Sequence, residues 1–206
     1  MNPALRAAAE AAIGFMPPDE GLALYEAALA APPGPLLEIG SYCGKSALYL
    51  GAAAREREGV LYSIDHHRGS EEHQPGESYH DPALVDAGGR VDTFPVFRKT
   101  IEDAGLTDVV VPLVAPSVVV ARGWATPLSF VFVDGGHSQA AAEADFAGWA
   151  PHVVTRGLLA IHDVFEDPAE GGRPPYVIYR RAIDSGAFTE VSRAGSLRVL
   201  GRTGVG

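Results

Sequence analysis

The sequence of 206 residues contains a single cysteine, Cys43, and only two lysines, Lys45 and Lys99. One thiol cannot form a disulfide within the chain, and it excludes a zinc site built from several cysteines. Scarce cysteine is also typical of a reducing compartment, so we expect a cytoplasmic protein.

Positive charge and long apolar runs are also scarce. Sixteen Lys and Arg residues against 26 Asp and Glu residues give a net charge of −10. A chain this acidic does not attract a nucleic-acid backbone or an anionic membrane surface, so we expect neither partner. No apolar run reaches the roughly 20 residues of a membrane-spanning helix. The first residues, MNPALRAAAEAAIGF, lack the basic start and the cleavage site of a signal peptide.

The sequence does contain a regular alternation of apolar segments, which we interpret as one domain over residues 1–206. The segments expected to be strands are 36–39, 60–64, 109–114, 129–133, 157–161, 188–191 and 196–200. The segments expected to be helices are 19–31, 45–55, 82–87, 91–104, a short one from 117, 138–149 and 176–185. Residues 1–31 would form an N-terminal helical cap. The alternation predicts an α/β fold with a doubly wound, mostly parallel seven-stranded sheet and an antiparallel C-terminal hairpin.

The most informative stretch is PLLEIGSYCGKSALY, at residues 35–49. It predicts a buried strand, a glycine-rich turn and a helix. Gly40 and Gly44 can adopt backbone angles that other residues avoid, and the helix begins with unpaired N–H groups. Glu38 at the strand end would repel a phosphate, so the turn favours a different small molecule.

Polar residues gather where the expected strands end. In doubly wound sheets the ligand lies beyond the carboxyl ends of the strands. The residues predicted at these ends are Glu38, Asp65, Asp134, His162 and Asp163. Two long polar segments, 66–81 and 164–175, follow two of these strands, and their length predicts functional loops.

From about residue 36 to residue 163, this arrangement resembles the class I S-adenosylmethionine-dependent methyltransferases. Their first motif is an acid followed by three glycines at alternate positions, which here is Glu38-x-Gly40-x-Tyr42-x-Gly44. Tyr42 replaces the middle glycine, a variant of the caffeoyl-CoA and catechol O-methyltransferases. The resemblance implies S-adenosylmethionine as the cofactor, with Asp65 on its ribose hydroxyls. The residues that it places around the cofactor are Glu38, Gly40, Ser41, Tyr42, Gly44, Ser46, Asp65, Ser117 and Asp134.

The stretches FVFVDGGHS and GLLAIHDV resemble the metal-dependent O-methyltransferases, including those that act on the sugars of macrolides and aminocoumarins. The resemblance implies that Asp134, His162 and Asp163 bind a divalent metal. Two carboxylates suit Mg²⁺, whereas a histidine in place of the usual acid provides a nitrogen ligand, which favours Mn²⁺, Fe²⁺ or Zn²⁺. His162 could instead orient one of the carboxylates without touching the metal.

His137 lies three residues after Asp134, where the catechol and caffeoyl-CoA enzymes carry a lysine base. The resemblance therefore implies that His137 is the catalytic base and that Asp134 assists it. A divalent ion would lower the pKa of an acceptor hydroxyl, and an imidazole could then take its proton. The alternative is that His137 lies in the first turn of the next helix with its ring in solvent.

The acceptor-side loops, 66–81 and 164–175, are rich in His and Glu and carry few aromatic residues. This composition favours a carbohydrate or glycoside acceptor, for instance a mannose- or glucose-containing oligosaccharide. His66, His67, His73 and His80 are irregularly spaced, which favours a lid or sugar contacts over a metal cluster.

The alternatives are an O-methyltransferase for a catechol or another small molecule, a nucleotide-dependent oxidoreductase and a scaffold that has lost its chemistry. The oxidoreductase would require the complete G-x-G-x-x-G pattern that Tyr42 interrupts. Family members often dimerise, so the resemblance also implies a homodimer.

Overall fold

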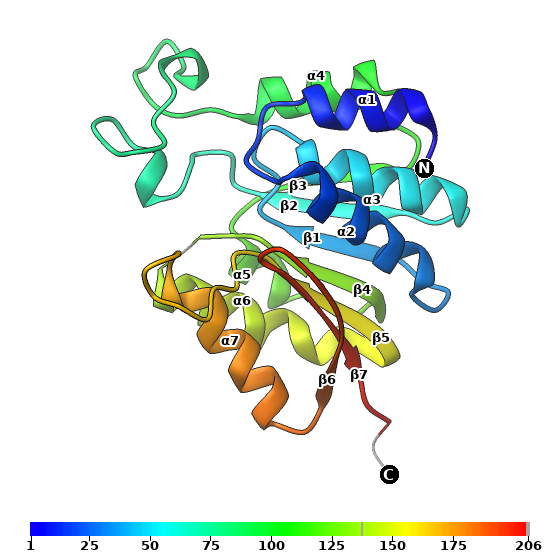
Figure 1. Cartoon of the computed structure of the whole chain (residues 1–206). Helices are drawn as coiled ribbons and strands as arrows, with labels where there is room; N and C mark the ends of the chain where they lie inside the picture. Colours follow the sequence, from blue (N-terminus) through cyan, green and yellow to red (C-terminus); the bar gives the residue numbers. More distant parts are fainter. Residues whose placement is uncertain (137, 205–206) are drawn as a thin grey trace.

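Seven strands form one sheet in the computed structural model, which describes residues 1–136 and 138–204 (Figure 1). The strands are β1 Leu36–Ile39, β2 Leu61–Asp65, β3 Val110–Val114, β4 Leu128–Val133, β5 Val153–Ile161, β6 Phe188–Ala194 and β7 Leu197–Arg202. Their spatial order is β3-β2-β1-β4-β5-β7-β6, and β7 runs antiparallel to both β5 and β6. The predicted fold, a mostly parallel sheet with an antiparallel C-terminal hairpin, is confirmed.

Helices cover both faces of the sheet (Figure 1). One face carries α1 Pro3–Ala11, α2 Pro18–Ala30, α3 Lys45–Glu56 and α4 Phe94–Asp103. The other carries α5 Ser117–Ala121, α6 Gln139–Trp149 and α7 Arg173–Asp184. Each face has its own apolar core, which explains why the central strands are apolar on both sides. Among the described residues, no helix combines the length and apolar character needed to cross a membrane.

The register of the central strands places their carboxyl ends together. Ile39 of β1 pairs with Val133 of β4, and Val133 pairs in turn with Ile161 of β5. The residues that directly follow these strands, Gly40, Asp134 and His162, are therefore neighbours at one edge of the sheet. The sheet thus assembles the segments that the sequence predicted to carry the site.

The connection between β2 and β3 differs from the prediction. Residues 82–87, expected to be a helix, form only a short 3₁₀ turn at Pro82–Leu84. Val85 and Val91 instead pair across a tight turn in an antiparallel bridge. The following helix, expected from residue 91, begins at Phe94 because the bridge occupies the preceding residues and a proline fits the first helical turn.

Candidate functional site

A cavity of about 1130 Å³ opens at the carboxyl ends of the central strands. Three segments that are distant in the sequence border it: residues 13–16 before α2, the loop 66–81 and the loop 164–175. Predicted site residues along its wall are Gly40, Ser41, Tyr42, Ser46, Asp65, Ser117, Asp134, His162 and Asp163. All three predicted metal residues and most of the predicted cofactor residues therefore share one cavity, whereas Glu38 and Gly44 lie outside its lining.

The glycine-rich turn after β1 adopts a left-handed backbone at three alternate positions. Gly40 has a φ of 88°, and a Cβ there would lie 2.0 Å from the carbonyl oxygen of Asp134, so only glycine fits against the end of β4. Gly44, with a φ of 96°, is the N-cap of α3. Tyr42 lies between them with a φ of 45°. The turn thus keeps a glycine-like backbone although its middle residue is tyrosine.

Asp65 at the end of β2 holds this turn in place. Its Oδ2 accepts hydrogen bonds from the backbone N–H groups of Ser41 (3.0 Å) and Tyr42 (2.8 Å). Its Oδ1 accepts from the N–H of His67 at 2.7 Å. The carboxylate also lines the cavity, where the ribose contact implied by the resemblance stays a prediction.

Glu38 is fully buried beneath the turn. Its carboxylate accepts hydrogen bonds from the hydroxyls of Ser46 (3.0 Å) and Ser63 (2.5 Å), and the Ser41 hydroxyl lies 2.5 Å from that of Ser63. Burial raises the pKa of Glu38 to about 7, and these hydrogen bonds oppose the rise. Glu38 and Ser46 thus support the turn from below, and their predicted contacts with the cofactor stay predictions.

Asp134, His162 and Asp163 offer ligand atoms that lie within 4.8 Å of one another. The Nδ1 atom of His162 lies 3.1 Å from Oδ1 of Asp134 and 3.5 Å from Oδ1 of Asp163. The imidazole is 5% exposed, whereas the two carboxylates are 22% and 30% exposed and line the cavity. Two carboxylate oxygens and one imidazole nitrogen at this spacing fit a divalent metal ion.

The electrostatics of this cluster favour a cation. Burial alone would lower the pKa of His162, but the charge and hydrogen bond of Asp134, the hydrogen bond to Glu20 and the charge of Asp163 raise it to about 11. Glu20 responds in the opposite sense. Burial would raise its pKa, but hydrogen bonds from His162 and Ser196 lower it below its ordinary value. The acids therefore favour a cation at this position. Without a metal that cation is the protonated His162 ring, whose Nδ1 proton a divalent ion would replace.

Sequence reasoning missed two buried acids, Glu20 and Asp145, each 5% exposed. Glu20 lies in the first turn of α2, where an acid usually interacts only with the helix dipole, so the sequence offers no signal. Asp145 lines the cavity and accepts a hydrogen bond from the Ser117 hydroxyl. Burial raises the pKa of Asp145 to about 6. Its position on the apolar face of α6, beside Phe146 and Trp149, is a signal that could have identified it.

The predicted base, His137, lies outside the described residues, so its role stays a prediction. Its sequence neighbours Gly136 and Ser138 both line the cavity. Ser138 caps α6 by accepting from the N–H of Ala141. The segment that carries the predicted base therefore borders the cavity on both sides of that position.

Aromatic rings gather at the side of the cavity bordered by the loop 66–81. Phe15 lies 5.6 Å from the ring of Tyr42 and 5.1 Å from that of Tyr79, measured between centroids, and His73 lies 5.0 Å from Tyr42. Phe15 is 61% exposed and Tyr79 is 50% exposed. We call these four residues the aromatic cluster. Phe15 and Tyr42 come from outside the loops, so the loop composition alone underestimates the aromatic surface.

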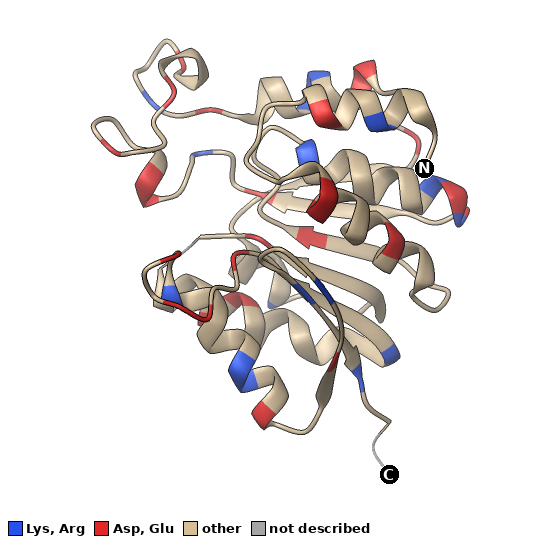
Figure 2. Cartoon of the chain, in the orientation of Figure 1, with Lys and Arg blue, Asp and Glu red and all other residues tan. Residues whose placement is uncertain are grey.

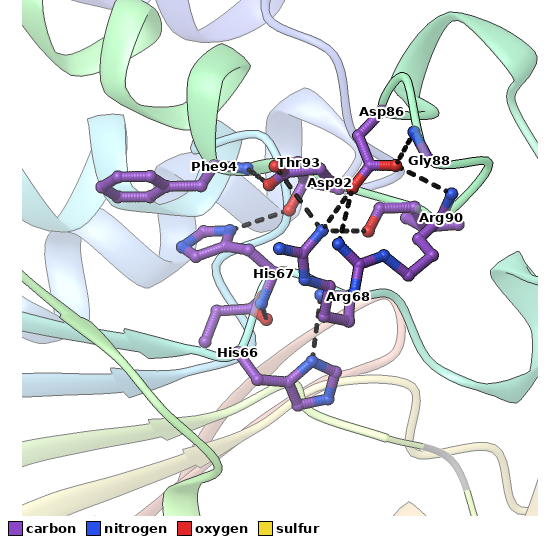
Figure 3. A network of polar contacts seen from close by, with 11 residues as sticks. His66, His67, Arg68, Asp86, Gly88, Arg90, Asp92, Thr93 and Phe94 are labelled. Carbon is purple, nitrogen blue, oxygen red and sulfur yellow. Dashed lines mark hydrogen bonds and ion pairs between the residues drawn. The ribbon is translucent and has the colours of Figure 1, made fainter.

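A polar network fixes the base of the loop 66–81 (Figure 3). The Arg68 guanidinium donates to Asp86 (3.1 Å) and to the carbonyl oxygen of Val91 (3.2 Å). The His67 ring is 2% exposed, and its Nδ1 lies 2.8 Å from the Thr93 hydroxyl. Burial lowers the pKa of His67. Within the group of four loop histidines, His67 therefore has a structural role that anchors the loop next to α4.

Comparisons with known proteins find a matching family model and solved structures of the same fold. The family model described as a methyltransferase domain matches residues 37–164. The O-methyltransferase TomG from Streptomyces achromogenes, involved in tomaymycin synthesis and solved with SAM, is 16% identical, with 99% of this chain and 91% of that chain covered and a TM-score of 0.66. The SAH-bound methyltransferase PaMTH1 from Podospora anserina is 13% identical, with 99% and 89% covered and a TM-score of 0.68. An O-methyltransferase from Bacillus cereus in complex with SAH is 17% identical, with 97% and 88% covered and a TM-score of 0.59. Identities this low reflect a shared fold.

Proposed function

Because this chain belongs to the methyltransferase domain family, we propose that it transfers the methyl group of S-adenosylmethionine to a hydroxyl oxygen of a carbohydrate or glycoside. One observation carries the proposal: the turn after β1 and the cluster of Asp134, His162 and Asp163 line a single cavity. A cofactor on the turn and an acceptor hydroxyl at the cluster would then lie side by side, as methyl transfer requires.

The cofactor end of the cavity suits a sulfonium compound. The turn presents backbone atoms at close range, and α3 begins there with its positive end, which suits the carboxylate of the cofactor. Asp65 and Asp134 line the same region and provide negative charge for a cationic cofactor. Asp145 and Ser117 form a polar pair farther along the wall, and Ser117 is one of the predicted cofactor residues.

The chemistry follows from the acidic cluster. A divalent ion held by Asp134, His162 and Asp163, Mg²⁺ in the first instance or Mn²⁺, would supply positive charge that lowers the pKa of the acceptor hydroxyl. His137 takes the hydroxyl proton. The oxygen then attacks the methyl carbon in line, the carbon–sulfur bond breaks, and S-adenosylhomocysteine leaves with the electron pair on sulfur.

The acceptor end favours an uncharged polyhydroxyl compound. Glu71, Glu77 and Glu170 line it, and Lys45 is the only lysine or arginine among the described lining residues. The Lys45 ammonium donates to the carbonyl oxygen of Ala12 at 3.3 Å. Acidic segments outnumber basic ones in the loops at this edge of the sheet (Figure 2). Carboxylates accept hydrogen bonds from sugar hydroxyls, and the aromatic cluster offers faces for the apolar side of a sugar ring.

The aromatic cluster also favours a second candidate, a catechol or another small aromatic acceptor. The rings of Phe15 and Tyr79 meet edge to face, with an interplanar angle of 69°, and both are at least half exposed, so a flat acceptor ring could stack on their exposed faces. A catechol would also present two adjacent hydroxyls to the acidic cluster.

A methyl-transfer assay separates these candidates. The full chain is incubated with S-adenosylmethionine and either glycosides or catechols, with Mg²⁺, Mn²⁺ or EDTA, and products are identified by mass spectrometry. We expect methylated glycosides and no turnover in EDTA. Methylation of catechols alone would replace the carbohydrate proposal with the second candidate, and full activity in EDTA would remove the metal from it.

Paired histidine variants test the base. His137→Ala should lower kcat by roughly 100-fold or more while leaving the affinity for S-adenosylhomocysteine unchanged. His80→Ala is the matched control, because its Nδ1 contacts the carbonyl oxygen of His73 within the loop, and it should retain kcat. A His137→Ala variant with normal kcat would show that His137 is not the base.

The homodimer stays a prediction, which light scattering of the purified chain would test.

A further inference from the structure

Glu20 is the one charged side chain that joins the N-terminal segment to the acidic cluster in the described part of the chain. It lies 142 positions before His162 in the sequence, yet its Oε2 lies 2.7 Å from the Nε2 atom of that imidazole. Both side chains are almost fully buried, at 7% and 5% exposed. A carboxylate buried in this place requires specific partners, because burying a charge without hydrogen bonds or a counter-charge is unfavourable.

The β6–β7 turn fixes the orientation of this carboxylate. The N–H of Ser196 donates to Oε1 of Glu20 at 2.8 Å, and the Ser196 hydroxyl donates to Oε2 at 3.0 Å. Gly195 adopts a φ of 49°, and a Cβ there would lie 2.0 Å from Oε1 of Glu20. The carbonyl oxygen of Ser196 also accepts from the N–H of Val164, just after Asp163. The β6–β7 turn therefore fixes the Glu20 carboxylate in one position beside the acidic cluster.

The contacts of His162 assign different tasks to its two nitrogens. Nε2 faces Glu20, whereas Nδ1 faces the oxygens of Asp134 and Asp163. A divalent ion would replace the proton on Nδ1, because a histidine ligand must be neutral. An ionised carboxylate only accepts hydrogen bonds, so the ring beside Glu20 then keeps its remaining proton on Nε2. The lone pair of Nδ1 is then available beside the oxygens of Asp134 and Asp163 as a third ligand.

We propose that Glu20 is a positioning residue that holds His162 as the Nε2–H tautomer and thereby presents Nδ1, together with Asp134 and Asp163, to the divalent ion. This inference rests on the metal in the proposed function. It follows the general pattern in which a histidine ligand donates its second N–H to a carboxylate, which fixes the ring and raises its basicity. A nitrogen ligand of this kind favours Mn²⁺ over Mg²⁺, so Glu20 should influence the choice of metal.

Metal binding to the full chain tests the inference without recourse to activity. Mn²⁺ binding is measured by electron paramagnetic resonance with saturating S-adenosylhomocysteine, for the wild type, Glu20→Gln and Ser196→Ala. We expect Glu20→Gln to weaken Mn²⁺ binding by roughly 10- to 100-fold and to weaken Mg²⁺ binding less. Ser196→Ala removes one hydrogen bond to the same carboxylate and leaves His162 in contact with it, so it should retain the metal affinity within about threefold. Equal Mn²⁺ affinity of Glu20→Gln and the wild type would overturn the role of Glu20.

A second measurement needs no variant and stays decisive if Glu20→Gln fails to fold. Nitrogen NMR of the Zn²⁺-loaded wild type should show His162 with a proton on Nε2 and the metal on Nδ1. A metal on Nε2, or a His162 ring without metal, would contradict the inference. A wild type that binds S-adenosylhomocysteine but neither Mn²⁺ nor Zn²⁺ would overturn both this inference and the metal in the proposed function. It would leave the methyltransferase assignment intact.

Discussion

At the scale of single residues, Tyr42 shows how a turn built for glycine accommodates a large side chain. Its φ of 45° lies in the left-handed region, which costs a residue with a Cβ about 1–2 kcal/mol. The backbone N–H of Tyr42 donates to Asp65, and its ring contacts Phe15 and His73. These contacts offset the strain, and they give the turn an aromatic surface at the cavity that glycine could not provide.

Two substitutions at Tyr42 separate strain from contact. Tyr42→Ala removes the ring and keeps the strained Cβ, whereas Tyr42→Gly removes both. We therefore expect Tyr42→Gly to have a free energy of unfolding about 1 kcal/mol higher than that of Tyr42→Ala in urea denaturation. Both variants should raise the KM for the acceptor, because the Tyr42 ring belongs to the aromatic cluster at the cavity. An alanine variant as stable as the glycine variant would show that the turn relaxes and that the strain is absent.

Asp145 predicts a pH dependence of stability. Burial raises its pKa from 3.8 to about 6, so the folded protein binds this proton more tightly than the unfolded chain does. The contribution of Asp145 to the free energy of unfolding therefore falls as pH rises from about 4 to about 6, and it stays low above that window. The asparagine of Asp145→Asn has no group that ionises in this pH range. Its amide oxygen can still accept the hydrogen bond from the Ser117 hydroxyl.

The stability of Asp145→Asn relative to the wild type should thus increase between pH 4 and pH 6.5, by at most about 3 kcal/mol. Urea denaturation of both proteins at several pH values measures this difference. Asp108→Asn, whose side chain is 72% exposed, is the control and should show a difference that does not change with pH. A flat difference for Asp145→Asn as well would mean that Asp145 is already ionised at low pH in the folded state.

At the scale of elements, the strands and most helices could be predicted because their signals are local. Apolar runs with turn residues at both ends define β1 and β4, and α3 and α6 begin and end within one residue of their predicted bounds. The structure of the segment 82–93 could not be predicted, because it depends on one bridge between Val85 and Val91 and on a hydrogen bond from Arg68, 23 residues before Val91. A single bridge and a contact from another segment leave no periodic pattern in a sequence.

The polar network at the loop base predicts how the loop 66–93 behaves as an element. Asp86 accepts hydrogen bonds from the N–H groups of Gly88 and Arg90 and from Arg68, and these bonds lower the pKa of Asp86 (Figure 3). Asp86→Ala removes all three acceptor contacts. Amide hydrogen exchange in residues 66–93 should then accelerate severalfold while the exchange of β1 and β4 stays unchanged.

The matched control for this experiment is Asp108→Ala, which removes an acidic partner of Arg55 outside the loop. It should leave the exchange of residues 66–93 at the wild-type rate. Uniform acceleration across the whole chain in Asp86→Ala would show that Asp86 supports the global fold and not the loop alone.

At the scale of the whole molecule, the site draws on segments from most of the chain. The sequence predicted the residues at the strand ends, because parallel strands must bring their carboxyl ends together. It did not predict Phe15 or Glu20, because an isolated ring or acid before the first strand carries no sign of its partners. The N-terminal segment packs over the sheet edge only in the folded tertiary structure. There Phe15 completes the aromatic cluster and Glu20 contacts His162.

The net charge of −10 and the acidic acceptor side together predict discrimination by charge. A neutral glycoside should react with a kcat/KM that changes little between about 20 and 200 mM salt, whereas a phosphorylated form of it should react more slowly and improve as salt screens the repulsion. Glu77 is exposed and lines the cavity, so Glu77→Lys should raise kcat/KM for the phosphorylated acceptor roughly fivefold and leave the neutral one unchanged. Glu26→Lys makes the same charge change on the exposed face of α2 and should alter neither acceptor. If the wild type preferred the phosphorylated acceptor, its acidic lining would have to face away from the acceptor, and the carbohydrate proposal would lose its electrostatic support.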